Sequence, residues 1–173
     1  YKSYFKNGYT NINRHARGAP ITRYAAKRNM GPQIRAQYNA MVKAYDDMPG
    51  FKGTSYRGTG QMNAADWEAR LAPYRDNVGG IVNEKMFFST SARKSTGYRW
   101  QNSRPNRIEF KIEGRSGIAA DGQEAFDELE VLFNSNTQFE VVSVEVAQDA
   151  ASMLADGRGR AYDNYALVIL REI

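Results

Sequence analysis

Residues 126–133 read Phe-Asp-Glu-Leu-Glu-Val-Leu-Phe, a stretch in which Leu129, Val131 and Phe133 alternate with Glu128 and Glu130. Alternation with a period of two predicts a half-buried β-strand. Residues two apart on a strand face the same side, so Glu128 and Glu130 are expected to point into one space. Leu129, between them, is expected to point into the core and fix the register.

The rest of the chain shows the same kinds of pattern. We expect helices at 32–48 and 63–73, and strands at 51–59, 86–91, 108–113, 139–146 and 165–170. Residues 1–20 are expected to form an irregular arm with room for a short helix, 114–122 a loop and 147–161 a mobile insertion. Because the helices come early and the strands late and antiparallel, the predicted fold class is α+β.

The composition narrows the range of functions. The 173 residues carry 24 Lys and Arg against 19 Asp and Glu, a formal net charge of +5. This length predicts one domain over residues 1–173, and the first residue, Tyr1 rather than Met, suggests a fragment of a longer protein. The absence of Cys excludes thiolate chemistry, and a single histidine, His15, argues against histidine triads and zinc sites. No segment approaches the roughly 20 apolar residues that would cross a bilayer.

Two short motifs precede the acidic stretch. Tyr56-Arg57-Gly58 lies on the first expected strand, and Ser89-Thr90-Ser91 ends the second. Each motif alone has an ordinary structural explanation. A strand arginine usually forms an ion pair, Ser and Thr often end strands, and Glu-x-Glu often marks a solvated face, as expected for Glu109 and Glu113. The combination and the order of the motifs are more informative than any one of them.

Together, the three motifs resemble the Arg…Ser-Thr-Ser…Glu-x-Glu signature of the arginine-specific mono-ADP-ribosyltransferases, a family of bacterial toxins and ecto-enzymes. The resemblance runs from about residue 50 to the end of the chain. It implies an α+β fold in which N-terminal helices pack on two mainly antiparallel sheets that form an NAD cleft. It also implies an enzyme that transfers ADP-ribose from NAD to an arginine side chain of a target protein and releases nicotinamide.

The resemblance assigns the catalytic roles residue by residue. Glu130 would stabilise the oxocarbenium-like ribose that forms as nicotinamide departs, and Ser89 would contact NAD and position Glu130. Glu128 would orient and deprotonate the acceptor guanidinium, whose pKa of about 13.8 makes it a poor nucleophile. NAD is a consumed substrate in this chemistry, and no metal is needed.

Further residues are expected to bind NAD. Arg57 would hold the NAD phosphates with its permanently charged fork. The backbone of Gly58 could approach the nicotinamide amide because glycine has no side chain. Thr90 and Ser91 complete the NAD-binding motif, chiefly as supports of the strand end.

Aromatic residues are expected to contact both the nicotinamide and the target protein. Either Tyr98 or Trp100 would stack on the nicotinamide, and the spacing does not separate the two. Phe126, Asp127 and Glu128 are expected to contact the target protein, at the end of a recognition loop over residues 118–127.

The resemblance also implies a setting and partners. We expect a secreted bacterial toxin or effector that acts in the cytosol of a target cell, bacterial or eukaryotic, on a protein bearing the acceptor arginine. If the toxin also threatens the cell that produces it, we expect a partner that binds it, either a neutralising immunity protein or a chaperone. Nucleic-acid and membrane partners are not expected.

Alternative functions use the same residues differently. An NAD glycohydrolase would use water as acceptor, but hydrolysis requires only Glu130, so the presence of Glu128 argues against it. A basic module that binds nucleic acid or a partner is disfavoured because nothing places the scattered basic residues on one face. The intact signature argues against an inactive member of the family.

Overall fold

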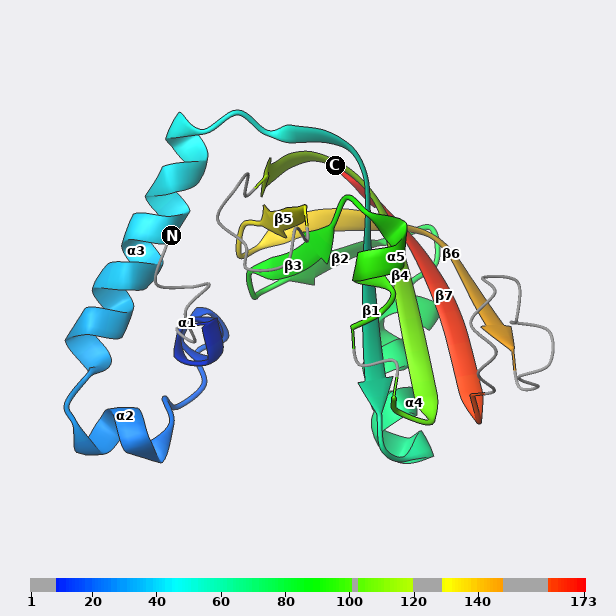
Figure 1. The fold of residues 1–173 in the computed structure, drawn as a ribbon, viewed down its shortest axis with the longest axis horizontal. Helices are drawn as coiled ribbons and strands as arrows, with labels where there is room; N and C mark the ends of the chain where they lie inside the picture. Colours follow the sequence, from blue (N-terminus) through cyan, green and yellow to red (C-terminus); the bar gives the residue numbers. More distant parts are fainter. Residues whose placement is uncertain (1–8, 101–102, 120–128, 148–161) are drawn as a thin grey trace.

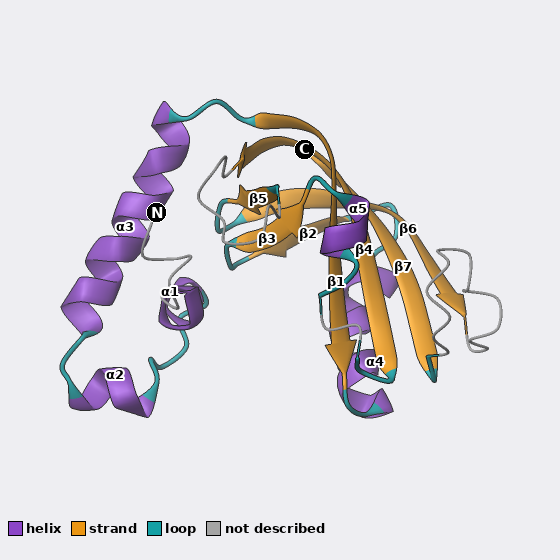
Figure 2. Cartoon of the chain, viewed as in Figure 1, coloured by secondary structure: helices purple, strands orange, loops and turns teal. Residues whose placement is uncertain are grey.

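A computed structural model describes residues 9–100, 103–119, 129–147 and 162–173, and these form an α+β fold (Figures 1 and 2). In chain order the elements are α1 (Tyr9–Ala16), α2 (Arg23–Lys27), α3 (Gly31–Asp47), β1 (Phe51–Gln61), α4 (Ala64–Arg75), β2 (Ile81–Glu84), β3 (Phe88–Ser91), α5 (Lys94–Gly97), β4 (Asn106–Ala119), β5 (Glu130–Phe133), β6 (Thr137–Ala147) and β7 (Asn164–Glu172). No helix in this described part of the chain has the length and apolar character needed to cross a membrane.

The strands form one continuous hydrogen-bonded sheet in the order β1-β3-β5-β4-β7-β6-β2, with an additional pairing of β1 with β4. β4 joins its parts. Most of β4 pairs antiparallel with β1 and parallel with β7, whereas its last residues, Ile118 and Ala119, pair with β5. The two sheets expected from the resemblance are therefore linked through β4. Figure 1 shows β3 and β5 beside the long strands β1, β4 and β7.

Helix α4 covers the apolar face of the sheet. The helix begins at the predicted cap, where Asn63 Oδ1 accepts a hydrogen bond from the Asp66 N–H at 2.8 Å. Its buried side chains, which join the main core, are Trp67, Leu71 and Tyr74. The helix continues two residues past its predicted end at Pro73, and the Asp76 N–H closes the last turn on the Ala72 carbonyl at 2.9 Å.

The N-terminal helices form a smaller core to one side of the sheet. The helix predicted from Pro32 is confirmed as α3. Met41 of α3 packs with Ile12 of α1 and with Phe87 and Leu132 from the sheet side. The short helix allowed for in the arm over residues 1–20 is found as α1, although its bounds were not predicted. Ile12 is the one buried residue of that helix, and a single apolar residue gives no periodic signal.

Strand β4 is longer and more buried than expected. It continues to Ala119 through part of the loop predicted at 114–122. Its glycines reflect close packing, because a Cβ at Gly114 would lie 2.6 Å from the Phe133 ring. The strand face expected to be solvated is also buried at Glu109, which is 6% exposed and pairs with Arg107 at 3.2 Å.

Strand β5 begins later than expected, at Glu130. Leu129 has a φ of 46° and is 39% exposed, so the prediction that it points into the core was wrong. Strand alternation requires extended backbone, and the left-handed conformation at Leu129 interrupts it. The strand argument for placing Glu128 beside Glu130 is therefore lost, and Glu128 itself lies outside the described residues.

The remaining strand predictions are confirmed by β1, β3, β6 and β7. Strand β2 was missed because its four residues, Ile81–Glu84, are too few for a clear pattern. The insertion predicted at 147–161 falls almost entirely outside the described residues.

Candidate active site

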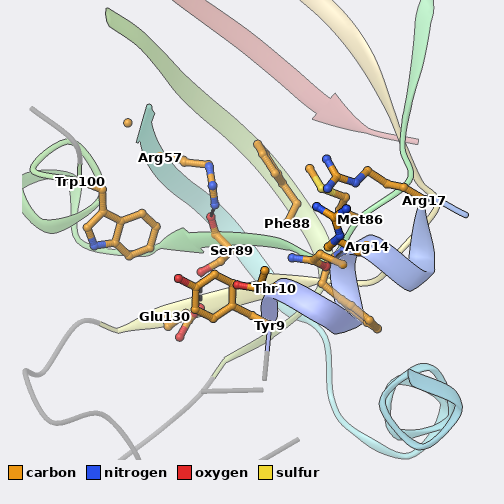
Figure 3. Close-up of a pocket in the computed structure, with 13 residues that line it drawn as sticks. Tyr9, Thr10, Arg14, Arg17, Arg57, Met86, Phe88, Ser89, Trp100 and Glu130 are labelled. Carbon is orange, nitrogen blue, oxygen red and sulfur yellow. Dashed lines mark hydrogen bonds between the residues drawn. The ribbon is translucent and has the colours of Figure 1, made fainter. Parts of the chain in front are cut away.

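One pocket of about 690 Å³ brings the sequence motifs together (Figure 3). Its walls come from α1, β1, β3, the start of β5 and the turn after α5, which are far apart in the sequence. The residues that line it are Tyr9, Thr10, Asn13, Arg14, Arg17, Arg57, Gly58, Met86, Phe87, Phe88, Ser89, Trp100 and Glu130.

Ser89 and Glu130 are in direct contact on the pocket wall. The Ser89 hydroxyl donates a hydrogen bond to Glu130 Oε1. Glu130 is the first residue of β5 and is 7% exposed, so its carboxylate reaches the pocket from an otherwise buried strand. A carboxylate held in this way is oriented in advance to stabilise a cation that develops in the pocket.

Arg57 projects from β1 toward the same wall. Its Nη1 donates a hydrogen bond to the Ser89 carbonyl at 2.5 Å. The guanidinium carbon lies 5.1 Å from the Phe88 ring centroid and 6.0 Å from that of Trp100, within cation–π range. These contacts fix the fork of Arg57 at the pocket, beside Ser89 and Trp100 (Figure 3).

Gly58 lines the pocket on one side and is tightly packed on the other. A Cβ built on Gly58 would overlap the guanidinium of Arg107. Glycine is therefore required here by a buried side chain behind the strand, whatever approaches from the pocket.

Two members of the Ser-Thr-Ser motif lie outside the pocket. Thr90 is fully buried, and its hydroxyl donates to the Val131 carbonyl at 2.8 Å, which ties β3 to β5. The buried Ser91 Oγ accepts from the Arg93 N–H at 3.0 Å, which closes the turn after the strand. Both side chains act on the strand end, and only Ser89 of the motif lines the cavity.

The two aromatic candidates are separated by the structure. Trp100 lines the pocket, whereas Tyr98 is 4% exposed and packs edge-on against Tyr56 with ring centroids 5.3 Å apart. Only Trp100 of the two faces the site.

Helix α1 contributes pocket residues that the sequence analysis missed. Thr10, Asn13 and Arg14 of α1, and Arg17 just after its end, follow the three-to-four spacing of one helix face and line the cavity. Figure 3 shows Thr10, Arg14 and Arg17 on this side of the pocket. The spacing is visible in the sequence, but a polar helix face is usually solvated, so it gave no signal for a site.

The described lining is strongly cationic. Its charged side chains are three arginines, Arg14, Arg17 and Arg57, against one carboxylate, Glu130. The described residues contain no group of three or more His, Cys, Asp or Glu that could hold a metal ion. Such a lining is complementary to a ligand with anionic groups at one end and a developing cation at the other.

The segment expected to recognise the target is not among the described residues. Phe126, Asp127 and Glu128 fall in the interval 120–128, and their predicted roles remain predictions.

Sequence comparison finds two curated relatives, while no family model matches the chain. The NAD(+)–protein-arginine ADP-ribosyltransferase Tre1 of Serratia proteamaculans is 28% identical over 138 residues, covering 79% of this chain and 26% of Tre1. Vis of Vibrio splendidus, named as an NAD(+)–arginine ADP-ribosyltransferase, is 26% identical over 147 residues, covering 80% of this chain and 55% of Vis. The match thus spans about a quarter of one relative and just over half of the other.

Solved structures share the fold. The Vis structure in complex with agmatine has a TM-score of 0.67 at 22% identity, with 99% of this chain and 70% of that one covered. The ATR domain of Salmonella SpvB has a TM-score of 0.70 at 22% identity, with 99% of this chain and 96% of that one covered. The chain has the fold of these domains, and about four fifths of its length is similar in sequence to two proteins named as arginine ADP-ribosyltransferases.

Proposed function

We propose that this protein transfers ADP-ribose from NAD to an arginine side chain of a target protein and releases nicotinamide. The observation that carries the proposal is the contact of Ser89 with Glu130 in a pocket that also holds Arg57. The names of Tre1 and Vis support the same reaction.

The pocket suggests how NAD lies. Trp100 and Glu130 lie toward one side of the cavity, and the α1 arginines, Arg14 within the helix and Arg17 just after it, lie toward the other (Figure 3). In our proposal the nicotinamide ribose sits at the Trp100 side, and the phosphates face Arg57 and the α1 arginines. This orientation places the sole described carboxylate of the lining beside the bond that breaks.

The reaction then proceeds by separation of charge. The bond between ribose C1′ and the nicotinamide nitrogen breaks, and its electron pair leaves with neutral nicotinamide. The ribose becomes oxocarbenium-like, and the Glu130 carboxylate, oriented by Ser89, stabilises that positive charge. A guanidinium nitrogen of the acceptor forms the new bond to C1′ and gives up a proton.

Glu128 is proposed to accept that proton and to orient the acceptor. An arginine guanidinium is protonated at neutral pH, so it needs a base close to the attacking nitrogen. The Vis complex with agmatine, which carries a guanidinium group, supports an acceptor of this chemistry. Phe126 and Asp127 are proposed to contact the target protein beside Glu128.

We also propose that residues 1–173 act as one catalytic domain of a secreted toxin or effector, which works in the cytosol of a target cell. A pocket lined by both α1 and the sheet supports one functional unit. The solved structure of Vis as a toxin supports the setting.

Two assays on the purified protein test the proposed function. Nicotinamide release from NAD measures bond cleavage, and labelling of agmatine with ADP-ribose measures transfer. Wild type should show both, and Glu130→Ala should lose at least about 100-fold in both, because it removes the stabilising charge. Wild type that releases nicotinamide without labelling agmatine would instead be a glycohydrolase, and wild type inert in both assays would refute the proposal.

A further inference from the structure

The structure contains an arginine that the catalytic proposal does not use. Arg107, on β4, has the largest fully buried side chain of the described residues, with 0% exposure. Burying a guanidinium is costly unless its charge and its N–H groups are satisfied. The contacts of Arg107 therefore indicate what it does.

Two of these contacts lead to the turn that carries Trp100. Arg107 Nη1 donates to the Trp100 carbonyl, and Nη2 donates to the Tyr98 carbonyl. A planar fork that binds two carbonyls fixes the position of the backbone between them. Arg99 lies between Tyr98 and Trp100 in the sequence, and its side chain is exposed. The two carbonyls are bound by Arg107.

The remaining contacts hold Arg107 in place. Its Nε pairs with Glu109 Oε1 at 3.2 Å, and the second oxygen of Glu109 accepts from the Tyr165 hydroxyl at 2.9 Å. Trp67 Nε1 on α4 donates to the Arg107 carbonyl at 2.9 Å. The guanidinium is thus linked through Glu109 on β4 to Tyr165 on β7, and the Arg107 backbone is bonded to α4.

Arg107 also lies directly behind the pocket. Its guanidinium occupies the space that a Cβ on Gly58 would need, and Gly58 lines the cavity on its other side. One buried side chain thus contacts both Gly58 and the turn of Trp100, two parts of the pocket wall.

We propose that Arg107 is a positioning residue that holds the Trp100 turn against the nicotinamide end of the pocket. The inference rests on the proposed function, because it assigns Trp100 to that end. It adds a role for a buried ion pair that lies outside the three sequence motifs.

The test uses variants that separate this role from stability. Arg107→Met alone would leave Glu109 buried and unpaired, which would destabilise the fold. The double variant R107M/E109Q removes both charges together with the donors to the two carbonyls. R107K keeps a positive charge for Glu109 but loses the planar fork. R99M is the matched control. It makes the same Arg-to-Met change at an exposed site in the turn that carries Trp100.

The readouts are steady-state kinetics of nicotinamide release and the emission and acrylamide quenching of Trp100. The Trp100 signal is obtained by comparing each variant with its own Trp100→Phe version. We expect R107M/E109Q and R107K to shift the Trp100 signal and to lose about 10- to 100-fold in kcat/KM, since small displacements of a binding group have effects of this size. R99M should match wild type in both readouts.

Several outcomes would overturn the inference. Folded variants with wild-type Trp100 signals would do so, as would kinetic losses without a change at Trp100, or changes at Trp100 without kinetic losses. If R107M/E109Q does not fold, R107K decides the question. Wild type without nicotinamide release would refute the proposed function, whereas the Trp100 signal measured without NAD would still report on Arg107.

Discussion

Ser89 and Glu130 meet diagonally across two strands. The backbone partner of Ser89 is Leu132, and the partner of Glu130 is Ser91, so the two residues are offset by two positions in the β3–β5 pairing. Diagonal neighbours of this kind share a face of an antiparallel pair, which lets the serine hydroxyl reach the carboxylate. The sheet register itself therefore orients Glu130.

Removing this hydroxyl should slow bond cleavage while the protein remains folded. Ser89→Ala leaves the carboxylate charge in place but frees its rotation, so we expect about a 10- to 100-fold loss in kcat/KM for nicotinamide release. Ser103→Ala, at an exposed serine, is the control. A Ser89→Ala enzyme with wild-type kinetics would show that the hydrogen bond is not used in the reaction.

Substitution of Glu128 should affect ADP-ribose transfer and nicotinamide release differently from substitution of Glu130. We predict that Glu128→Gln loses ADP-ribose transfer to agmatine but retains part of the nicotinamide release, because only transfer needs a base for the guanidinium. Glu145→Gln, at an exposed site on β6, is the control. Equal losses in both assays would contradict the separate roles of Glu128 and Glu130.

Arg17, just after the end of α1, should contribute to binding of the ADP-ribose part of NAD and not to binding of nicotinamide. Arg17→Ala removes an exposed cation from the pocket lining, so ADP-ribose should inhibit the variant about 3- to 10-fold more weakly, while inhibition by nicotinamide stays the same. Arg23→Ala on α2, an exposed arginine away from the pocket, is the control. Unchanged inhibition by ADP-ribose would place the phosphates away from α1.

Two buried tyrosines should make the protein sensitive to alkali. Burial, and then the neighbouring Glu109, raise the pKa of Tyr165, and burial, followed by Glu84, raises the pKa of Tyr74. Above the ordinary tyrosine pKa of about 10, the unfolded chain loses these protons while the folded chain keeps them. The free energy of unfolding should therefore fall with rising pH, by up to about 1.4 kcal/mol per pH unit for each tyrosine.

Thermal unfolding of wild type and of Tyr165→Phe between pH 8 and pH 11 measures this dependence. The variant is expected to be less stable at pH 8, because Glu109 loses a hydrogen-bond donor, but to show a shallower decline above pH 10. Identical slopes for the two proteins would exclude Tyr165 as a source of the alkaline sensitivity.

The sequence predicted the elements whose patterns are local. The stripe of α3, the Asn63 cap and the alternation in β4 depend on neighbours within a few residues, and these elements were found where expected. The pairing of Ser89 with Glu130 was expected from the family signature, since no local rule brings two distant strands together.

The misses have physical causes as well. The burial of Glu109 depends on Arg107 and Tyr165, and the partnership with Tyr165 follows only from the parallel pairing of β4 with β7. Leu129 fits the alternating pattern, but its backbone is left-handed, a conformation that a leucine side chain gives no reason to expect. The pocket face of α1 is polar, and polarity alone does not distinguish a binding surface from a solvated one.

The way α1 is held has a consequence for how the protein meets its substrate. An eight-residue helix is too short to be stable alone. Helix α1 is held by the packing of Ile12, by the edge-on contact of His15 with Tyr38, and by hydrogen bonds that the Thr22 N–H donates to Asn11 Oδ1 and the Phe87 N–H donates to Asn13 Oδ1. A dinucleotide bridging this helix and the sheet would add its own binding energy to that weak attachment. Tryptic cleavage after Arg17 should then slow when NAD is present, because the proposed substrate would also act as a clamp that holds α1 on the sheet.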